Sequence, residues 1–137
     1  MKEITVKAVG ENMPELTAFI DSELEAVDCP MKQQMQIDMA IDEIFSNICL
    51  YAYQPETGMA TIRFDFDEAE GAVTLTFIDQ GRPYNPLQKE DPDVTLPAEQ
   101  RAIGGLGIFL VKKTMDSLDY RHENGQNMFS IKKIIRT

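Results

Sequence analysis

The chain has few of the residues from which metal and redox sites are built. Its 137 residues include two cysteines, Cys29 and Cys49, and one histidine, His122. One histidine without a cluster of cysteines argues against a structural zinc site. Cys49 lies among apolar residues, and we expect both thiols to be buried and reduced, as in a reducing cytosol. His122 falls in an expected strand, and we assign it no chemistry.

Long hydrophobic runs are also absent. No stretch approaches the roughly 20 apolar residues that a membrane-spanning helix needs. The first residues, Met1–Val6, contain neither the apolar core nor the cleavage site of a secretory signal. We therefore expect a cytoplasmic protein.

Basic residues are in the minority. The chain has 13 Lys and Arg against 23 Asp and Glu, which gives a formal net charge of -10. A field of this sign repels nucleic acids and anionic membranes, so it argues against a general binder of either. It is compatible with a bound nucleotide or a basic protein partner, although excess acid often serves solubility alone. The 43% hydrophobic and 26% charged residues are typical of a globular protein, and we expect one domain over residues 1–137.

Hydrophobic periodicity divides the first half of the chain into a strand and two helices. Alternation over residues 3–8 predicts a strand at the edge of a sheet. A capping pattern with Asn12 as N-cap begins the first helix, which ends at Cys29-Pro30. A second helix is expected over residues 31–53, with an apolar stripe on one face.

The second half predicts two hairpins and one helix. A turn at Ala69-Glu70-Gly71 joins the first pair of strands, and Asn124-Gly125 joins the last pair. The helix between the hairpins is expected to bury Ile108, Val111 and Met115. The expected ranges are strands 61–66 and 72–78, helix 108–116, and strands 119–122 and 128–135.

Glu43 and Asn47 are candidate functional residues in the second helix. Because they are four residues apart, they lie on one side of the helix, beside the apolar stripe. A carboxylate and an amide at the edge of a core suit a metal ion and a proton transfer. They are equally compatible with ordinary flanking positions, and the pair by itself favours that interpretation.

Residues 82–103 have no hydrophobic period and contain four prolines. A loop longer than about 15 residues in a compact domain is usually a lid or a binding loop, with an indifferent surface insertion as the alternative. Gly104-Gly105-Leu106-Gly107 then leads into the next helix. Glycines before a helix N-terminus suit phosphate binding, but a plain turn needs them as well.

Three segments together resemble the GHKL-type ATP-binding (Bergerat) fold. Residues 43–47, with Tyr51-Ala52-Tyr53 after them, resemble its N-box. Residues 79–86 resemble its first glycine box, and residues 104–108 its second. The resemblance covers essentially the whole chain and is greatest to the bacterial anti-sigma-factor serine/threonine kinases. It implies an α+β two-layer sandwich: a mixed, mostly antiparallel sheet, helices on one face, and an ATP lid at about 82–103.

The resemblance also implies roles for individual residues. Glu43 would be the general base, and Asn47 would ligate Mg²⁺ between the phosphates of ATP. Asp79 would accept a hydrogen bond from the adenine amino group, and Gly81 would let the chain pass the ring. Further nucleotide contacts are implied for Gly105, Leu106, Gly107, Asn127 and Arg101. Asn127 stands where the family often has threonine, and Arg101 either reaches the γ-phosphate or remains a solvated lid residue.

The function implied by the resemblance is that of an ATP-dependent serine/threonine protein kinase acting as an anti-sigma factor. Such a protein transfers the γ-phosphate of ATP to a small antagonist protein and sequesters a sigma factor, usually as a homodimer. The alternative is a nucleotide-binding regulatory switch without significant kinase activity, and a purely structural domain is a third possibility. ATP and Mg²⁺ are the implied cofactors.

Overall fold

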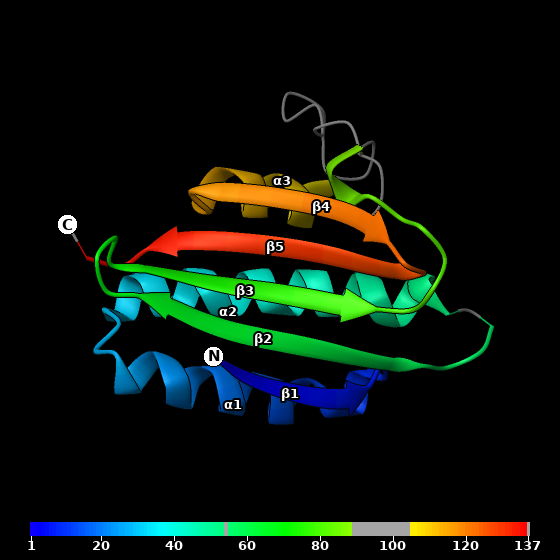
Figure 1. The fold of residues 1–137 in the computed structure, drawn as a ribbon, viewed down its shortest axis with the longest axis horizontal. Coiled ribbons are helices and arrows are strands. Elements are labelled where there is room, and N and C mark those ends of the chain that lie inside the picture. The colour runs from blue at the N-terminus through cyan, green and yellow to red at the C-terminus, as the bar shows by residue number, and fades with distance from the viewer. Residues whose placement is uncertain (54, 89–104, 137) are drawn as a thin grey trace.

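The computed structural model describes residues 1–53, 55–88 and 105–136 (Figure 1). The expected lid over 82–103 therefore lies mostly outside the described residues. The principal elements are β1 (Lys2–Lys7), α1 (Met13–Ala26), α2 (Met31–Asn47), β2 (Met59–Asp67), β3 (Ala72–Asp79), α3 (Gly105–Thr114), β4 (Ser117–Glu123) and β5 (Gln126–Ile134). Shorter helical turns are η1 (Gly10–Asn12), η2 (Ile48–Ala52) and η3 (Pro86–Gln88).

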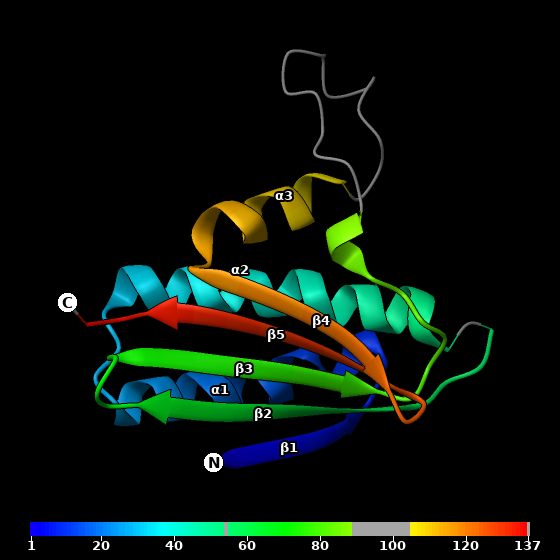
Figure 2. The same cartoon turned by 45° about the horizontal axis from the view of Figure 1, so that its top comes forward.

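The five strands form one sheet in the order β1-β2-β3-β5-β4, with β1 at an edge as expected. Each of the four neighbouring pairs is antiparallel. The two views of the ribbon place α1, α2 and α3 on one side of the sheet, with α3 behind β4 in Figure 1 (Figures 1 and 2). The predicted α+β sandwich with helices on one face is confirmed, and its sheet is antiparallel at every neighbouring pair rather than mixed.

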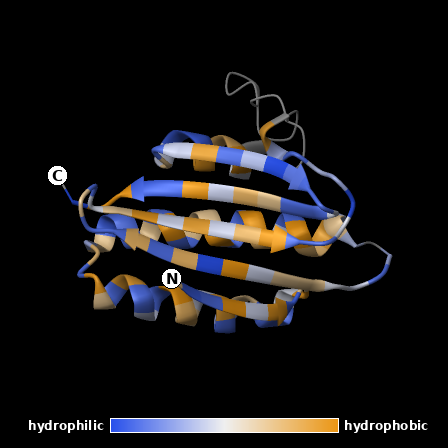
Figure 3. Ribbon diagram, in the orientation of Figure 1, coloured by the Kyte–Doolittle hydropathy of each residue, from blue (hydrophilic) through white to orange (hydrophobic). Residues whose placement is uncertain are grey.

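The core lies between the sheet and the helices. Hydrophobic and hydrophilic residues alternate along β2 and β5 (Figure 3), because successive side chains of a strand point to opposite faces. Phe77 of β3 pairs with Phe129 of β5 and with Ile62 of β2, and all three are buried. From the helices, the largest fully buried side chains are Leu16, Ile20, Leu24, Ile37, Ile41, Phe45 and Ile108.

The start of α1 differs from the expectation in one detail. Asn12 occupies the N-cap position, but it has helical dihedral angles and its side chain makes no capping hydrogen bond. Instead, its Nδ2 donates to the backbone oxygen of Lys7 at 2.9 Å. The turn η1 precedes α1 directly, so Asn12 ties the helix entry back to β1 rather than capping the helix.

The expected helix over 31–53 is regular only as far as Asn47. Its last turn, η2, is a π-helix. A π-turn widens the helix and displaces the chain after it, and such turns often occur at functional sites. Here the backbone oxygen of Ala52 accepts a hydrogen bond from the backbone N–H of Arg82 at 2.9 Å. The end of this helix is thereby joined to the segment that follows β3.

The hairpins and the third helix agree with their predictions. Asn124 and Gly125 both have positive φ, 53° and 75°, as a two-residue type I′ turn requires. The helix expected from Ile108 begins three residues earlier, at Gly105, and ends at Thr114. Ile108 and Val111 within it, and Met115 directly after it, are buried as predicted. Among the described helices, none combines the length and apolar character that a membrane span requires.

Candidate functional site

Asp79 is the last residue of β3 and is almost completely buried, with 6% of its surface exposed. Its Oδ1 accepts hydrogen bonds from Nδ2 of Asn127 at 2.8 Å and from the backbone N–H of Gly81 at 2.9 Å. The pKa of the Asp79 carboxyl is raised, because the effect of burial outweighs the lowering by these two hydrogen bonds and by the charge of His122. The result is a buried carboxylate held in one orientation by its neighbours.

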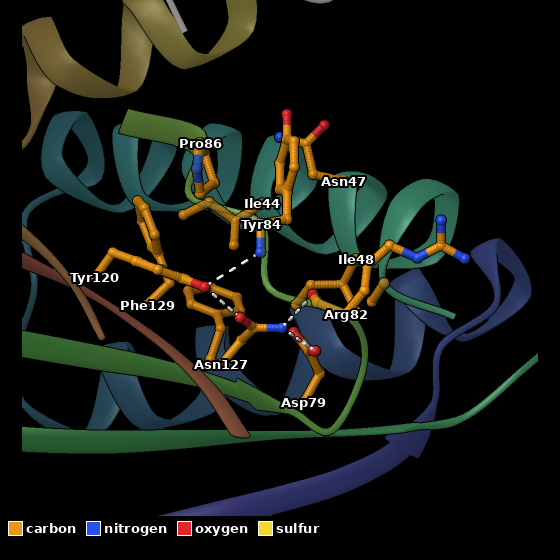
Figure 4. A pocket seen from close by; sticks show the side chains of 12 residues that line it. Ile44, Asn47, Ile48, Asp79, Arg82, Tyr84, Pro86, Tyr120, Asn127 and Phe129 are labelled. Carbon is orange, nitrogen blue, oxygen red and sulfur yellow. Dashed lines mark hydrogen bonds between the residues drawn. The ribbon is translucent and has the colours of Figure 1, made fainter. Parts of the chain in front are cut away.

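Asn127 organises this end of the site (Figure 4). Besides Asp79, its Nδ2 reaches the backbone oxygen of Arg82 at 2.8 Å. Its Oδ1 accepts a hydrogen bond from the hydroxyl of Tyr120, and that hydroxyl in turn accepts from the backbone N–H of Tyr84 at 3.2 Å. Asn127 is 5% exposed, so its amide is satisfied almost wholly within the protein. The predicted site residue is therefore a positioning group for Asp79 in this structure.

Tyr120 is a site residue that the sequence analysis missed. It lies on β4 directly opposite Phe129, which places its ring on the helix-covered face of the sheet. A single tyrosine in an alternating strand gives no signal of this role. Only the register between β4 and β5 brings its hydroxyl to Asn127.

A cavity of about 30 Å³ lies beside Asp79, enough for about one or two water molecules. Figure 4 shows the segment from Arg82 to Pro86 lying over it. Its wall is mostly apolar, and Asp79 is the buried acid in it. The lining residues are Ile44, Asn47, Ile48, Ala52, Phe77, Asp79, Arg82, Tyr84, Pro86, Tyr120, Asn127 and Phe129.

Gly81 has a structural reason for lacking a side chain. A Cβ at this position would lie 2.2 Å from the backbone oxygen of Ala52. Tyr53 fixes the same turn, because its hydroxyl accepts a hydrogen bond from the backbone N–H of Gln80 at 2.8 Å and donates to the backbone oxygen of Met59 at 2.6 Å. The close approach at Gly81 is thus to the protein's own π-turn.

Glu43 and Asn47 lie one turn apart on α2, as the sequence predicts. The Nδ2 of Asn47 is 3.5 Å from Oε1 of Glu43, a long hydrogen bond. Asn47 is 7% exposed and borders the cavity beside Asp79, whereas Glu43 lines a separate groove between α2 and α3. Asn47 and Glu43 therefore link two hollows, the cavity beside Asp79 and the groove between α2 and α3.

Gly107, in the first turn of α3, lies against the Glu43 carboxylate. A Cβ at this glycine would come within 2.0 Å of Oε2 of Glu43. The carboxylate thus occupies the space that any other residue at position 107 would fill. The first turn of a helix has backbone N–H groups without helical partners, which favour an anion nearby.

A family model described as the histidine kinase-like ATPase domain matches residues 6–133. The chain belongs to this family. Among similar proteins, the serine-protein kinase RsbW of Bacillus cereus (strain ATCC 10987) is 30% identical over 105 residues, with 72% of this chain and 62% of the relative covered. The serine-protein kinase RsbW of Bacillus mycoides (strain KBAB4) is 30% identical over 102 residues, with the same coverage. The chain thus spans less than two thirds of the length of these relatives.

Solved structures of histidine kinases are also similar to this histidine kinase-like ATPase domain. The histidine kinase domain of the blue-light activated histidine kinase from Erythrobacter litoralis EL346 has 14% sequence identity and a TM-score of 0.49. That match covers 77% of this chain and 46% of the other.

The structure of this histidine kinase-like ATPase domain places six of the predicted site residues in two groups. Asp79, Gly81 and Asn127 meet at the end of β3, and Glu43, Asn47 and Gly107 meet between α2 and α3. Gly105 is the first residue of α3, and Leu106 follows it, with a side chain outside the described part. Arg101 lies outside the described residues altogether. His122, to which no role was assigned, pairs across the strands with Asn127.

Proposed function

We propose that this domain binds Mg-ATP and transfers the γ-phosphate to a serine or threonine of a small antagonist protein. We also propose that it sequesters a sigma factor, as the resemblance to anti-sigma-factor kinases implies. Residues 1–137 would act as a single ATP-binding domain. The observation that carries the proposal is the placement of the Glu43 carboxylate beside Asn47 and against the first turn of α3. The name of its relatives, serine-protein kinase, supports the reaction class.

The end of the site at Asp79 suits adenine. An adenine ring needs apolar walls and one acceptor for its amino group, and this cavity combines apolar walls with the buried Asp79 carboxylate. Both hydrogen bonds that Asp79 receives from Gly81 and Asn127 end on Oδ1. In the proposal, Oδ2 accepts from the adenine amino group. Because the cavity holds only about one or two waters, part of the segment from Arg82 to Pro86 must move aside when the base enters.

Asn47 is the residue that would hold Mg²⁺. Its Nδ2 is directed to Glu43, which leaves its Oδ1 as the metal ligand. Among the described residues, no three His, Cys, Asp or Glu side chains gather into a metal site. This fits an ion that takes one protein ligand and otherwise phosphate oxygens and water, as magnesium commonly does. Bound there, it would neutralise the negative charge that develops on the phosphates.

Glu43 would act as the general base. As the acceptor oxygen forms its bond to the γ-phosphorus, the bond from that phosphorus to the β-phosphate oxygen breaks and ADP leaves. The hydroxyl proton passes to the Glu43 carboxylate. The long contact with Asn47 keeps the Glu43 carboxylate close to the residue that would hold Mg²⁺, so the proposed base and an ion held there would both be near the γ-phosphate.

The test is a comparison of Glu43→Gln with the wild-type protein. Gln keeps the size of the side chain beside Gly107 but cannot accept the proton, so transfer of label from ATP should fall at least about a hundredfold. The Mg-ATP thermal shift should remain. The control is Glu68→Gln, which makes the same exchange at an exposed glutamate in the turn between β2 and β3, away from both hollows, and should leave transfer unchanged. Undiminished transfer by Glu43→Gln would contradict the assignment of the base.

A regulatory nucleotide switch is the second candidate. It is favoured by the separation of the two hollows, since the residues proposed to hold the base line one cavity and Glu43 lines another. Nucleotide binding therefore does not require Glu43. A pull-down from the native cell with ATP or ADP, followed by a transfer assay on the retained proteins, distinguishes the two. Nucleotide-dependent retention without any transfer would favour the switch.

A further inference from the structure

The outward face of α2 carries methionines where an amphipathic helix normally places charged residues. Met31, Met35 and Met39 follow one another at intervals of four and are 68%, 58% and 56% exposed. Side chains four residues apart lie on the same side of a helix, so the three form one apolar strip, the methionine face. Exposed apolar strips of this kind mark surfaces of interaction, and methionine is common where a surface adapts to a partner.

The methionine face leads to the candidate base. Glu43 is the next residue in the same interval of four, one turn beyond Met39. With a rise of about 1.5 Å per residue, Met39 lies about 6 Å from Glu43 along the helix axis and Met35 about 12 Å. Met39 and Glu43 line the same groove between α2 and α3, together with Leu110, which is 39% exposed. The apolar surface is thus continuous with the place where the acceptor hydroxyl must arrive.

We infer that the methionine face is the docking surface for the phosphoacceptor protein. A general base must lie within hydrogen-bond reach of the proton that it removes, about 3 Å. A folded acceptor that brings a hydroxyl this close to Glu43 is much wider than one helical turn, so its surface covers Met39 and Met35 as well. The inference rests on the proposed kinase function and adds where the substrate binds.

The same geometry describes the chemistry of the acceptor. Around its hydroxyl it presents an apolar patch that fits the three methionines and Leu110. The exposed Asp42 lies in the groove beside Met39, and the chain carries a net charge of -10. A basic side chain at the rim of the apolar patch therefore complements this surface.

The test is a kinetic comparison of the wild-type protein with a variant carrying Met31→Gln, Met35→Gln and Met39→Gln. Gln preserves the length of the side chain and the helix propensity of methionine. The substrate is the protein that accepts label from the wild type in the transfer assay above. The KM for this acceptor should rise about tenfold or more, with kcat and ATP hydrolysis within about twofold of wild type. Met59→Gln, at a methionine 51% exposed on β2, is the matched control and should change none of these values.

A second variant and a second measurement keep the outcomes distinct. Met35→Glu places a like charge on an acidic surface and should raise KM in the same way, with circular dichroism confirming an unchanged melting curve. An unchanged KM in both variants overturns the inference and leaves the kinase proposal standing. A dimer in sedimentation that the triple variant dissociates also overturns it, because the face then binds a second copy of the chain. If the wild-type protein transfers no label to any retained protein, the kinase proposal fails and the docking inference with it.

Discussion

At the scale of single residues, Gly81 and Gly107 make the closest approaches in the candidate site, but to different kinds of neighbour. A Cβ at position 81 would lie 2.2 Å from the backbone oxygen of Ala52. At position 107 it would lie 2.0 Å from Oε2 of a glutamate side chain. A backbone in a π-turn cannot yield without disturbing its hydrogen bonds, whereas a side chain can change rotamer. Substitution of these two glycines should therefore have different effects, on stability at position 81 and on the position of the Glu43 carboxylate at position 107.

We expect Gly81→Ala to lower the free energy of unfolding by about 1–3 kcal/mol, as overpacking against fixed atoms does. Gly107→Ala should cost less than about 1 kcal/mol but displace the Glu43 carboxylate and lower label transfer about tenfold or more. Urea denaturation and the transfer assay measure the two effects. Gly10→Ala is the control for both, since nothing lies within 4 Å of a Cβ there. A Gly107→Ala protein with wild-type transfer would show that Glu43 does not need its present position.

The sequence alone was informative about some site residues and silent about others. Asp79 stands in the segment that resembles the first glycine box and Asn127 where the family often has threonine, and the structure brings them within 2.8 Å of one another. Tyr120 joins them only through the pairing of β4 with β5, and strand pairing depends on the register of the whole sheet. The resemblance assigns Gly81 to contact with a ligand. The structure shows that the space beside it is filled by the π-turn, which a hydrophobic pattern does not reveal.

At the scale of elements, two carboxyl groups meet where α1 packs on α2. Asp38 of α2 is close to Asp21 of α1, and burial together with the hydrogen bond and the charge of Asp21 raises the pKa of Asp38 to about 7. A carboxyl group that holds its proton in the folded protein binds a proton that the unfolded chain has released. Stability therefore depends on pH at this contact between helices.

The direction follows from the two pKa values of Asp38. Well below pH 4, the group is protonated in both states, so its raised pKa does not lower the free energy of unfolding there. As the pH rises from about 4 to about 7, the unfolded chain loses this proton first, so the free energy of unfolding falls. Above pH 7, the carboxyl group is charged in both states, and the free energy of unfolding is lowered by the full cost of charging Asp38 in the folded protein. We expect Asp38→Asn to raise the melting temperature at pH 8 and to change it little at pH 4, measured by calorimetry.

The control for this prediction is Asp42→Asn on the same helix. Asp42 is exposed, so its replacement should shift the melting temperature equally at both pH values. A gain from Asp38→Asn that is the same at pH 4 and pH 8 would contradict the raised pKa.

Elements were predicted well where one face is buried and less well at their ends. The apolar stripe of α2 is buried as expected, because its period fixes which side faces the sheet. The change to a π-turn after Asn47 has no such period to reveal it. Asn12 shows the same limit, since whether a polar side chain caps a helix or bonds to a neighbouring strand is decided by tertiary structure.

At the scale of the whole molecule, the candidate site is assembled from distant parts of the chain. The end of β3 supplies Asp79, β5 supplies Asn127, and α2 supplies Asn47, and all three line one cavity. A ligand that binds there contacts the sheet and the helix layer at once. Its binding energy therefore adds to the free energy of unfolding of the whole molecule.

We expect Mg-ATP at about 100 times its dissociation constant to add about 2.7 kcal/mol to the free energy of unfolding. For a chain of this length, that is a rise of roughly 8 °C in melting temperature, measured by differential scanning fluorimetry. GTP should produce a much smaller rise, because its carbonyl oxygen in place of the amino group would face the Asp79 carboxylate. Asp79→Asn should reduce the response to ATP, because the NH₂ group of the new side chain is a donor and would face the adenine amino group, which is also a donor. Equal shifts with ATP and GTP would remove Asp79 from base recognition, and no shift at millimolar Mg-ATP would favour a purely structural domain.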